Sequence, residues 1–384
     1  MEPAPPPSRC VAPHCALLRR AGYMRAAPRS RRHAAYRALV LLLAGAYLLQ
    51  EAAAAARARG LRELARVLFL LLCHVTAAAK QLVLLRRADA VDALARSFDA
   101  RRPPGARAAA LERALARRAR LLLRGYAGCA ALTCALWLLF PVLQRARARP
   151  VRFPFWTGVS TAPLPVFAAV LLYSFYVTTL VGIANTSMDA FLATILYQCK
   201  TQLTILRSDL ETLPERAARA ARAEGEGYET ALMRLFVDCY HHYHKVTETA
   251  ASFQAIFGTA ILIQFGIGGW ILCMAAYQLA SLSVLSIEFA SMLLFIICIL
   301  TELFLYCYCG NELTVESDRI VFSVYAMSWE RTPPRFRRCL LLLMERARRP
   351  LRPAAGCVVP LSLDTFVKIL KSSYTFYAVL HQTK

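Results

Sequence analysis

The chain has 384 residues, of which 58% are hydrophobic, and its mean hydropathy is +0.42. Soluble domains are about 45–50% apolar, whereas the apolar residues here form stretches of about twenty, the length that crosses a hydrocarbon core. The formal net charge of +23 lies in short segments between these stretches, which indicates membrane topology rather than a nucleic-acid surface.

Seven apolar segments are predicted to cross the membrane as helices, so the fold class is an all-α membrane protein. The fifth and sixth are the clearest, because no Lys or Arg occurs between Lys245 and Arg319. The first and seventh are shorter or carry charges. The predicted spans are residues 38–55, 64–85, 121–143, 165–189, 253–278, 286–309 and 361–383.

Lys and Arg are divided unevenly between the two sides of these spans. The N-terminal tail and every second loop after it hold 34 of the 47 basic residues, and the other side holds 8. Basic loops stay on the cytosolic side, so the N-terminus is predicted to be cytosolic and, after seven crossings, the C-terminus extracellular. A G-protein-coupled receptor would need the opposite orientation.

The sequence shows no evident catalytic or metal-binding site. The thirteen cysteines are scattered, several of them within apolar spans, where they pack as small hydrophobes. His241 and His244 could share a helix face, but no carboxylate–histidine motif of a zinc enzyme surrounds them. No catalytic triad, phosphate loop or carboxylate pair within a span is visible. We therefore predict no enzyme, no metal and no cofactor.

The seventh span carries a polar or small residue at every third or fourth position, which places these residues on one helix face. Ionisable residues within spans usually face a bundle interior or a water-filled cavity, so the stripe indicates a helix that lines an aqueous path. Alternatively, its charged residues lie below the membrane and snorkel to the surface. The stripe consists of Asp364, Lys368, Lys371, Thr375, Ala378 and Gln382.

Polar and aromatic side chains also occur in the outer halves of spans two to four. They fit a largely apolar ligand pocket with few polar groups, but small and polar residues also hold membrane helices together, and both interpretations stay open. The pocket candidates are Cys73, His74, Thr133, Trp137, Tyr173, Tyr176 and Thr179.

Three runs in the C-terminal third carry more specific motifs. They are LTELFLYCYCGNELTVESDRIVFSVYAMSW at the end of span six, LSLDTFVKILKSSYTFYAVLHQ in span seven, and YHHYHKVTETAASFQAIFGTAILIQF before span five. They resemble the corresponding segments of insect odorant receptors, and weaker similarity extends back through KQLVLLRRADAVDALARSFD. The loop of roughly residues 190–250 is compact and lacks the long insertion of the family's co-receptor. The chain thus looks like a ligand-tuned subunit.

The resemblance implies an odorant-gated, non-selective cation channel subunit that forms a heterotetramer with an odorant co-receptor. It implies a small, volatile, apolar ligand and a place in the plasma membrane of a sensory-neuron dendrite. Residues 1–37 would be a cytosolic tail, 38–309 a six-helix transmembrane domain with cytosolic helical extensions, and 310–384 an anchor segment with a pore-lining seventh helix. The alternatives are a gustatory-type channel, a G-protein-coupled receptor or a transporter.

The same resemblance assigns roles to individual residues in the last part of the chain. The hydrophobic gate of the pore falls on Val379, with Gln382 and Thr383 beside it and Thr375 further along the polar stripe. The anchor between subunits falls on the cytosolic ends of spans four to seven. Its candidate residues are Gly310, Asn311, Glu312 and Asp364.

Overall fold

The computed structural model describes residues 8–25, 30–98, 105–147, 151 and 153–382. These residues are mostly helical, with connecting loops, a short antiparallel hairpin of β1 (Ala354–Ala355) and β2 (Val359–Pro360) and a 3-10 turn, Trp329–Arg331. The helices are α1 (Ala12–Arg20), α2 (Arg31–Arg57), α3 (Leu61–Arg86), α4 (Ala88–Arg96), α5 (Ala106–Ala146), α6 (Leu164–Glu211), α7 (Leu213–Glu224), α8 (Tyr228–Ala280), α9 (Ile287–Ala326), α10 (Pro334–Ala347) and α11 (Leu363–Gln382).

Each predicted span lies on its own helix, so the all-helical membrane fold is confirmed. Six of these helices, α2, α3, α5, α6, α8 and α9, are long and apolar enough to cross a membrane. The seventh, α11, has 20 residues and carries three charges in its first half. Which end of the bundle faces the cytosol stays a prediction from the charge distribution.

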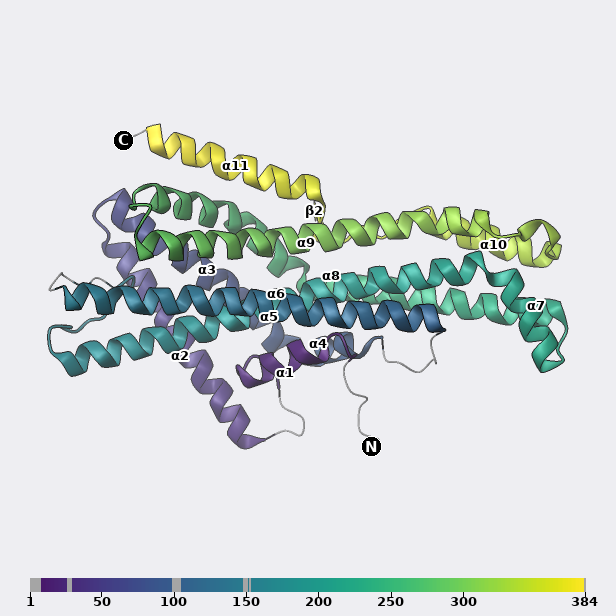
Figure 1. The fold of residues 1–384 in the computed structure, drawn as a ribbon, viewed down its shortest axis with the longest axis horizontal. Helices are drawn as coiled ribbons and strands as arrows, with labels where there is room; N and C mark the ends of the chain where they lie inside the picture. Colours follow the sequence, from purple (N-terminus) through teal and green to yellow (C-terminus); the bar gives the residue numbers. More distant parts are fainter. Residues whose placement is uncertain (1–7, 26–29, 99–104, 148–150, 152, 383–384) are drawn as a thin grey trace.

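Four helices are much longer than a membrane is thick. α5, α6, α8 and α9 have 41, 48, 53 and 40 residues, which at 1.5 Å per residue is about 60–80 Å. They lie along the longest axis of the molecule, with α7 and α10 at one end and the α5–α6 and α8–α9 connections at the other (Figure 1). The end with α7 and α10 is the one predicted to be cytosolic.

The middle of α6 is the centre of the fold. Every residue from 184 to 196 is buried, so neighbouring helices surround α6 on all sides there. α5, α8 and α9 pack along it. Any polar side chain in this part of α6 must therefore find its partners inside the protein.

The described part of the N-terminal segment contains a helix that packs on the bundle, because α1 contacts α6. His14 on α1 is fully buried, and its Nε2 lies 3.4 Å from Thr194 Oγ1 on α6. Burial lowers the pKa of His14 to about 4, since a buried charge is poorly solvated. His14 is therefore neutral at physiological pH and acts as a packing residue.

The chain between α10 and α11 is fixed by a tight turn and a close crossing. Gly356 and Cys357 both have positive φ, at 57° and 62°, as a type I′ hairpin turn requires. Gly356 N–H donates to the Gly258 carbonyl on α8 at 2.8 Å. Gly310 on α9 lies directly against the backbone of Leu361. These contacts set where α11 begins.

Candidate functional site

Two adjoining cavities lie among the transmembrane helices. The first cavity has a volume of about 220 Å³ and extends to Gln278 and Glu288 at the ends of α8 and α9. The second cavity, of about 70 Å³, lies deeper and reaches Asn185 and Glu302. The two cavities are neighbours, because four residues line both of them. These residues are Leu70, Cys134, Trp137 and Thr178.

Three aromatic rings stand where the cavities meet. Trp137 on α5 lies 5.7 Å, between ring centroids, from Phe295 on α9, and Phe69 on α3 lies 5.2 Å from Phe295. Such rings bury large apolar areas. The junction therefore suits a small apolar molecule held by contact rather than by charge.

Four of the predicted pocket residues come together around the second cavity. Cys73, His74, Thr133 and Trp137 all line it, and Trp137 also lines the first cavity. His74 is fixed by a fully buried carboxylate, because its Nδ1 lies 2.8 Å from Glu51 Oε2. His74 is thus held at the cavity wall by a partner from α2.

The three predicted pocket residues from span four lie outside the linings of these two cavities. The Tyr173 hydroxyl donates to Gln50 Oε1 at 3.1 Å, and Tyr176 is 44% exposed on the outside of the bundle. Thr179 is half-buried. The α6 residues that do line the cavities include Thr178 and Asn185, because the rotation of α6 turns those positions inward.

A fully buried charge cluster adjoins the second cavity, because one of its members, Glu302, lines that cavity. Lys80 Nζ on α3 donates to Asp189 Oδ1 on α6 at 2.6 Å and to Glu302 Oε1 on α9 at 2.5 Å. All three side chains are at most 1% exposed. The lysine therefore ties three helices together and offsets the repulsion between two carboxylates in a medium of low polarity.

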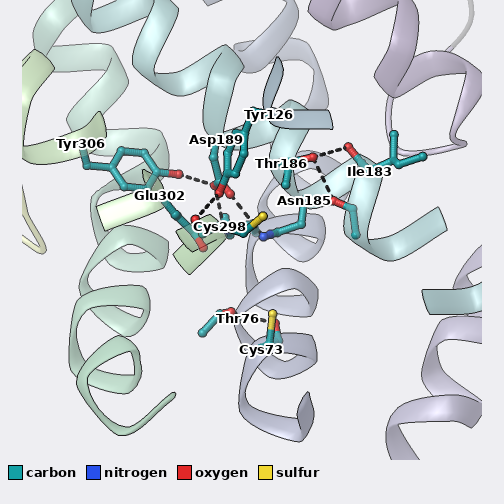
Figure 2. A network of polar contacts seen from close by, with 12 residues as sticks. Cys73, Thr76, Tyr126, Ile183, Asn185, Thr186, Asp189, Cys298, Glu302 and Tyr306 are labelled. Carbon is teal, nitrogen blue, oxygen red and sulfur yellow. Dashed lines mark hydrogen bonds and ion pairs between the residues drawn. The ribbon is translucent and has the colours of Figure 1, made fainter. Parts of the chain in front are cut away.

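Two neutral side chains complete this cluster. The Tyr306 hydroxyl donates to Asp189 Oδ1 at 2.5 Å, and Asn185 Nδ2 donates to Asp189 Oδ2 at 3.2 Å (Figure 2). Both oxygens of Asp189 are thus hydrogen-bonded. Because Glu302 also lines the second cavity, the cluster forms the polar floor of an otherwise apolar space.

The sequence does not reveal the carboxylate pair, because Asp189 and Glu302 come from different helices. A weaker signal is present in the sequence. Lys80, Asp189 and Glu302 are each a charged residue in an apolar span, and charges within spans usually mark paired or functional sites.

The polar stripe of α11 lies on an exposed side of the helix, and near its start Asp364 and Lys368 border a cavity between α11 and α8. Thr375 and Gln382 are exposed, and Lys368 Nζ pairs with Asp364 Oδ2 at 2.6 Å on the same surface. The opposite face of α11 packs on α8 and α9, where Trp270 stacks on Phe376 with 4.8 Å between ring centroids. A polar face turned outward is costly in lipid.

The predicted gate lies on the outward side of the same helix. Val379 is 55% exposed, about one turn from both Thr375 and Gln382. Thr383 lies outside the described residues. The outward side of α11 therefore carries both the polar stripe and an apolar residue near its C-terminal end.

The predicted anchor residues lie where α9 crosses α6 and the start of α11. Glu312 Oε2 on α9 is 3.7 Å from Lys200 Nζ on α6. Asn311 is half-buried beside it and Asp364 is exposed on the first turn of α11. Further along, Arg207 Nη1 donates to the nearly buried Glu316 Oε1 at 2.8 Å. This region is a cross-linked helix bundle within the chain.

The histidine-rich segment of α8 takes part in ordinary side-chain pairing. His242 Nε2 lies 2.9 Å from Gln202 Oε1, and His244 pairs with Glu248 one turn along the helix at 3.1 Å. In the described residues no group of three or more His, Cys, Asp or Glu side chains could hold a metal ion.

The fold defines a multi-pass helical membrane protein with internal cavities, and comparison with known proteins gives its family. The sequence profile described as "7tm Odorant receptor" matches residues 60–374, which is most of the chain. The chain belongs to this odorant receptor family, whose members are receptors and not enzymes.

Related sequences and solved structures agree with this assignment. The chain is 24% identical over 271 residues to odorant receptor Or2 of Anopheles gambiae, covering 69% of each chain. It is 29% identical over 140 residues to odorant receptor 94a of Drosophila melanogaster, covering 36% of each chain, so it spans about a third of that relative's length. The olfactory receptor OR5 of Machilis hrabei, solved with eugenol, has the same fold, with a TM-score of 0.82, 16% identity and coverage of 97% of this chain and 98% of that one.

Proposed function

We propose that this chain is the ligand-binding subunit of an odorant-gated, non-selective cation channel, which assembles with an odorant co-receptor in the plasma membrane of a sensory-neuron dendrite. The observation that carries the proposal is the outward stripe of α11, with Asp364, Lys368, Thr375 and Gln382 exposed along one helix. A polar face is stable within a membrane when it lines water or another subunit. Four such helices around one axis would enclose a path for ions.

The first and second cavities are the proposed odorant site. The second cavity and the junction are mostly apolar, with three aromatic rings, whereas the first cavity also carries Arg66, Gln278 and Glu288. A mostly apolar site with a few polar groups suits a small volatile molecule. The receptor of Machilis hrabei with the same fold was solved with eugenol, which supports a ligand of this size class for the present chain.

Gating would act through Val379. An apolar constriction closes a pore by dewetting, so Val379 would hold the path shut until the ligand acts. A ligand can open the path only by binding the open state more tightly. Thr375, Gln382 and Thr383 would then contact the passing ions.

Co-expression tests the proposal. Three samples are compared: the chain with the co-receptor, the chain alone, and the co-receptor alone. In each, currents are recorded across an odorant panel and with different cations in the bath. We expect odorant-evoked cation currents only when both subunits are present. Currents from the chain alone would indicate a gustatory-type channel that assembles by itself, and no evoked current in any arm would contradict the proposal.

The anchor between subunits gives a separate prediction. Glu312 is 30% exposed in its side chain and lies near one lysine of its own chain, so it retains hydrogen-bonding capacity toward a neighbouring subunit. Glu312→Ala should lower co-purification with the co-receptor by roughly two- to fivefold, the effect of a partly exposed ion pair worth up to about 1 kcal/mol.

Glu345→Ala is the matched control, because Glu345 also pairs with a basic residue of its own chain but is 71% exposed on α10. It should leave co-purification unchanged. Equal recovery of the co-receptor with both variants, together with normal currents, would remove Glu312 from the anchor.

A further inference from the structure

The carboxamide of Asn185 has a fixed orientation. Its Nδ2 donates to Asp189 Oδ2 at 3.2 Å. A carboxylate only accepts hydrogen bonds, so the Asn185 nitrogen must face Asp189 and the Asn185 oxygen must face away. Asp189 is held in turn by Lys80 and Tyr306. The direction of the Asn185 carbonyl is therefore set by the buried charge cluster.

The Asn185 oxygen lacks a partner within the described part of the chain. Asn185 is 6% exposed and lines the second cavity, and its Oδ1 is buried without a hydrogen bond. Buried polar atoms are nearly always paired, and an unpaired one calls for an explanation. Here the unpaired acceptor belongs to a residue of the cavity wall.

The hydroxyl donors around the same cavity are already in use. Thr133 Oγ1 donates to the Cys129 carbonyl at 2.9 Å, Thr186 Oγ1 to the Gly182 carbonyl at 3.0 Å, and Tyr126 to the Cys298 carbonyl at 3.0 Å. His74 Nδ1 is bonded to Glu51, so that nitrogen is also in use. Ligands that bring a donor therefore find a partner in this cavity more readily than ligands that bring only an acceptor.

The dimensions suit one small polar group with an apolar remainder. The second cavity has about 70 Å³, compared with about 30 Å³ for one water molecule in the liquid. A hydroxyl and its nearest carbons fill such a space. The rest of the molecule would extend past Trp137 and Phe295 into the first cavity.

We propose that the second cavity selects odorants with a hydrogen-bond donor, namely alcohols and phenols, and that Asn185 Oδ1 accepts the hydrogen bond from the ligand hydroxyl. This inference rests on the proposed function, because it names the ligand class of the same site. Asn185 is the residue that determines this specificity, and the charge cluster positions it.

Isomeric probe pairs test the inference on the purified complex of this chain with the co-receptor. The pairs are hexan-1-ol with methyl pentyl ether, and 4-ethylphenol with 4-methylanisole; each pair has the same atoms, and only the first member donates. Binding is measured as ligand-dependent thermal stabilisation. We expect the donors to bind about three- to tenfold more tightly, which corresponds to one net hydrogen bond.

Asn185→Leu should reduce this ratio to about one. Thr301→Val, which removes a hydroxyl bonded to its own helix at a position outside both cavities, should leave the ratio unchanged. If Asn185→Leu does not fold, the wild-type ratio decides the question. Equal binding of isomers, no binding of any probe, or a preference that survives in Asn185→Leu would overturn the inference.

The two proposals can fail separately. Odorant currents evoked by ketones or esters, with no preference for hydroxyl compounds in binding, would leave the proposed channel function standing and remove the donor selectivity. A clear donor preference in binding without any evoked current would support the cavity chemistry and contradict the channel proposal.

Discussion

Lys80→Met is expected to abolish surface expression of the receptor. Lys80 is fully buried and balances Asp189 and Glu302 at 2.6 and 2.5 Å. Methionine would leave two carboxylates facing each other without a counter-charge. Removing one partner of a buried ion pair costs about 3–5 kcal/mol, which is a large share of the stability of a folded domain. Surface labelling of intact cells and recovery of detergent-solubilised protein measure the effect.

A neutral cluster is the matched control for this prediction. Lys80→Met combined with Asp189→Asn and Glu302→Gln removes all three charges with little change in volume, and it should restore much of the surface expression. Normal expression of Lys80→Met alone would show that the cluster does not hold α3, α6 and α9 together. Poor expression of both variants would place the requirement on the lysine itself.

Gly310→Ala is expected to destabilise the protein by about 1–3 kcal/mol, the cost of overpacking a tight interface. A Cβ at this position would overlap Leu361 Cβ and lie 2.6 Å from the Leu361 carbonyl oxygen. The obstacle is backbone, so no rotamer change relieves it. The substitution would displace the start of α11. Both the thermal unfolding midpoint and the odorant-evoked current should therefore decrease.

Gly266→Ala provides the comparison, because a Cβ there meets nothing within 4 Å. Gly266 is also inside a long helix, so both substitutions change helix propensity alike. Gly266→Ala should leave the unfolding midpoint within a degree or so of the wild type or raise it. Equal behaviour of the two variants would show that α9 and Leu361 have room to separate.

The transmembrane parts of the fold could be predicted from the sequence because hydropathy marks them directly. The predicted span of residues 253–278 forms the second half of α8, which begins at Tyr228. The first half is polar on its surface and gives no hydropathy signal, and the same holds for the far ends of α6 and α9. Docking of α1 on α6 is a tertiary contact that hydropathy does not contain.

The sequence predicts the candidate site in part, namely the stripe of one helix and the cavity residues Cys73, His74, Thr133 and Trp137. The stripe from Asp364 to Gln382 follows from spacing along one segment, and the structure places it on one exposed side of α11. The cavities depend on how each helix is rotated, so Tyr173 and Tyr176 fall outside their linings. Asp189 and Glu302 meet only through packing of α6 on α9, which local periodicity does not specify.

Current recorded without odorant from Val379→Ser, co-expressed with the co-receptor, tests most directly whether α11 of this chain lines a gated ion path. Val379 is 55% exposed on the outward side of α11, and a polar residue there would wet an apolar constriction. The control is Val367→Ser, at a second exposed valine of the same helix that is 44% exposed and lies 12 residues, about 18 Å, nearer the start of α11, away from the proposed constriction. We predict increased odorant-independent cation current for Val379→Ser and wild-type current for Val367→Ser. Unchanged leak current in Val379→Ser at normal surface expression would contradict the placement of α11 in the path.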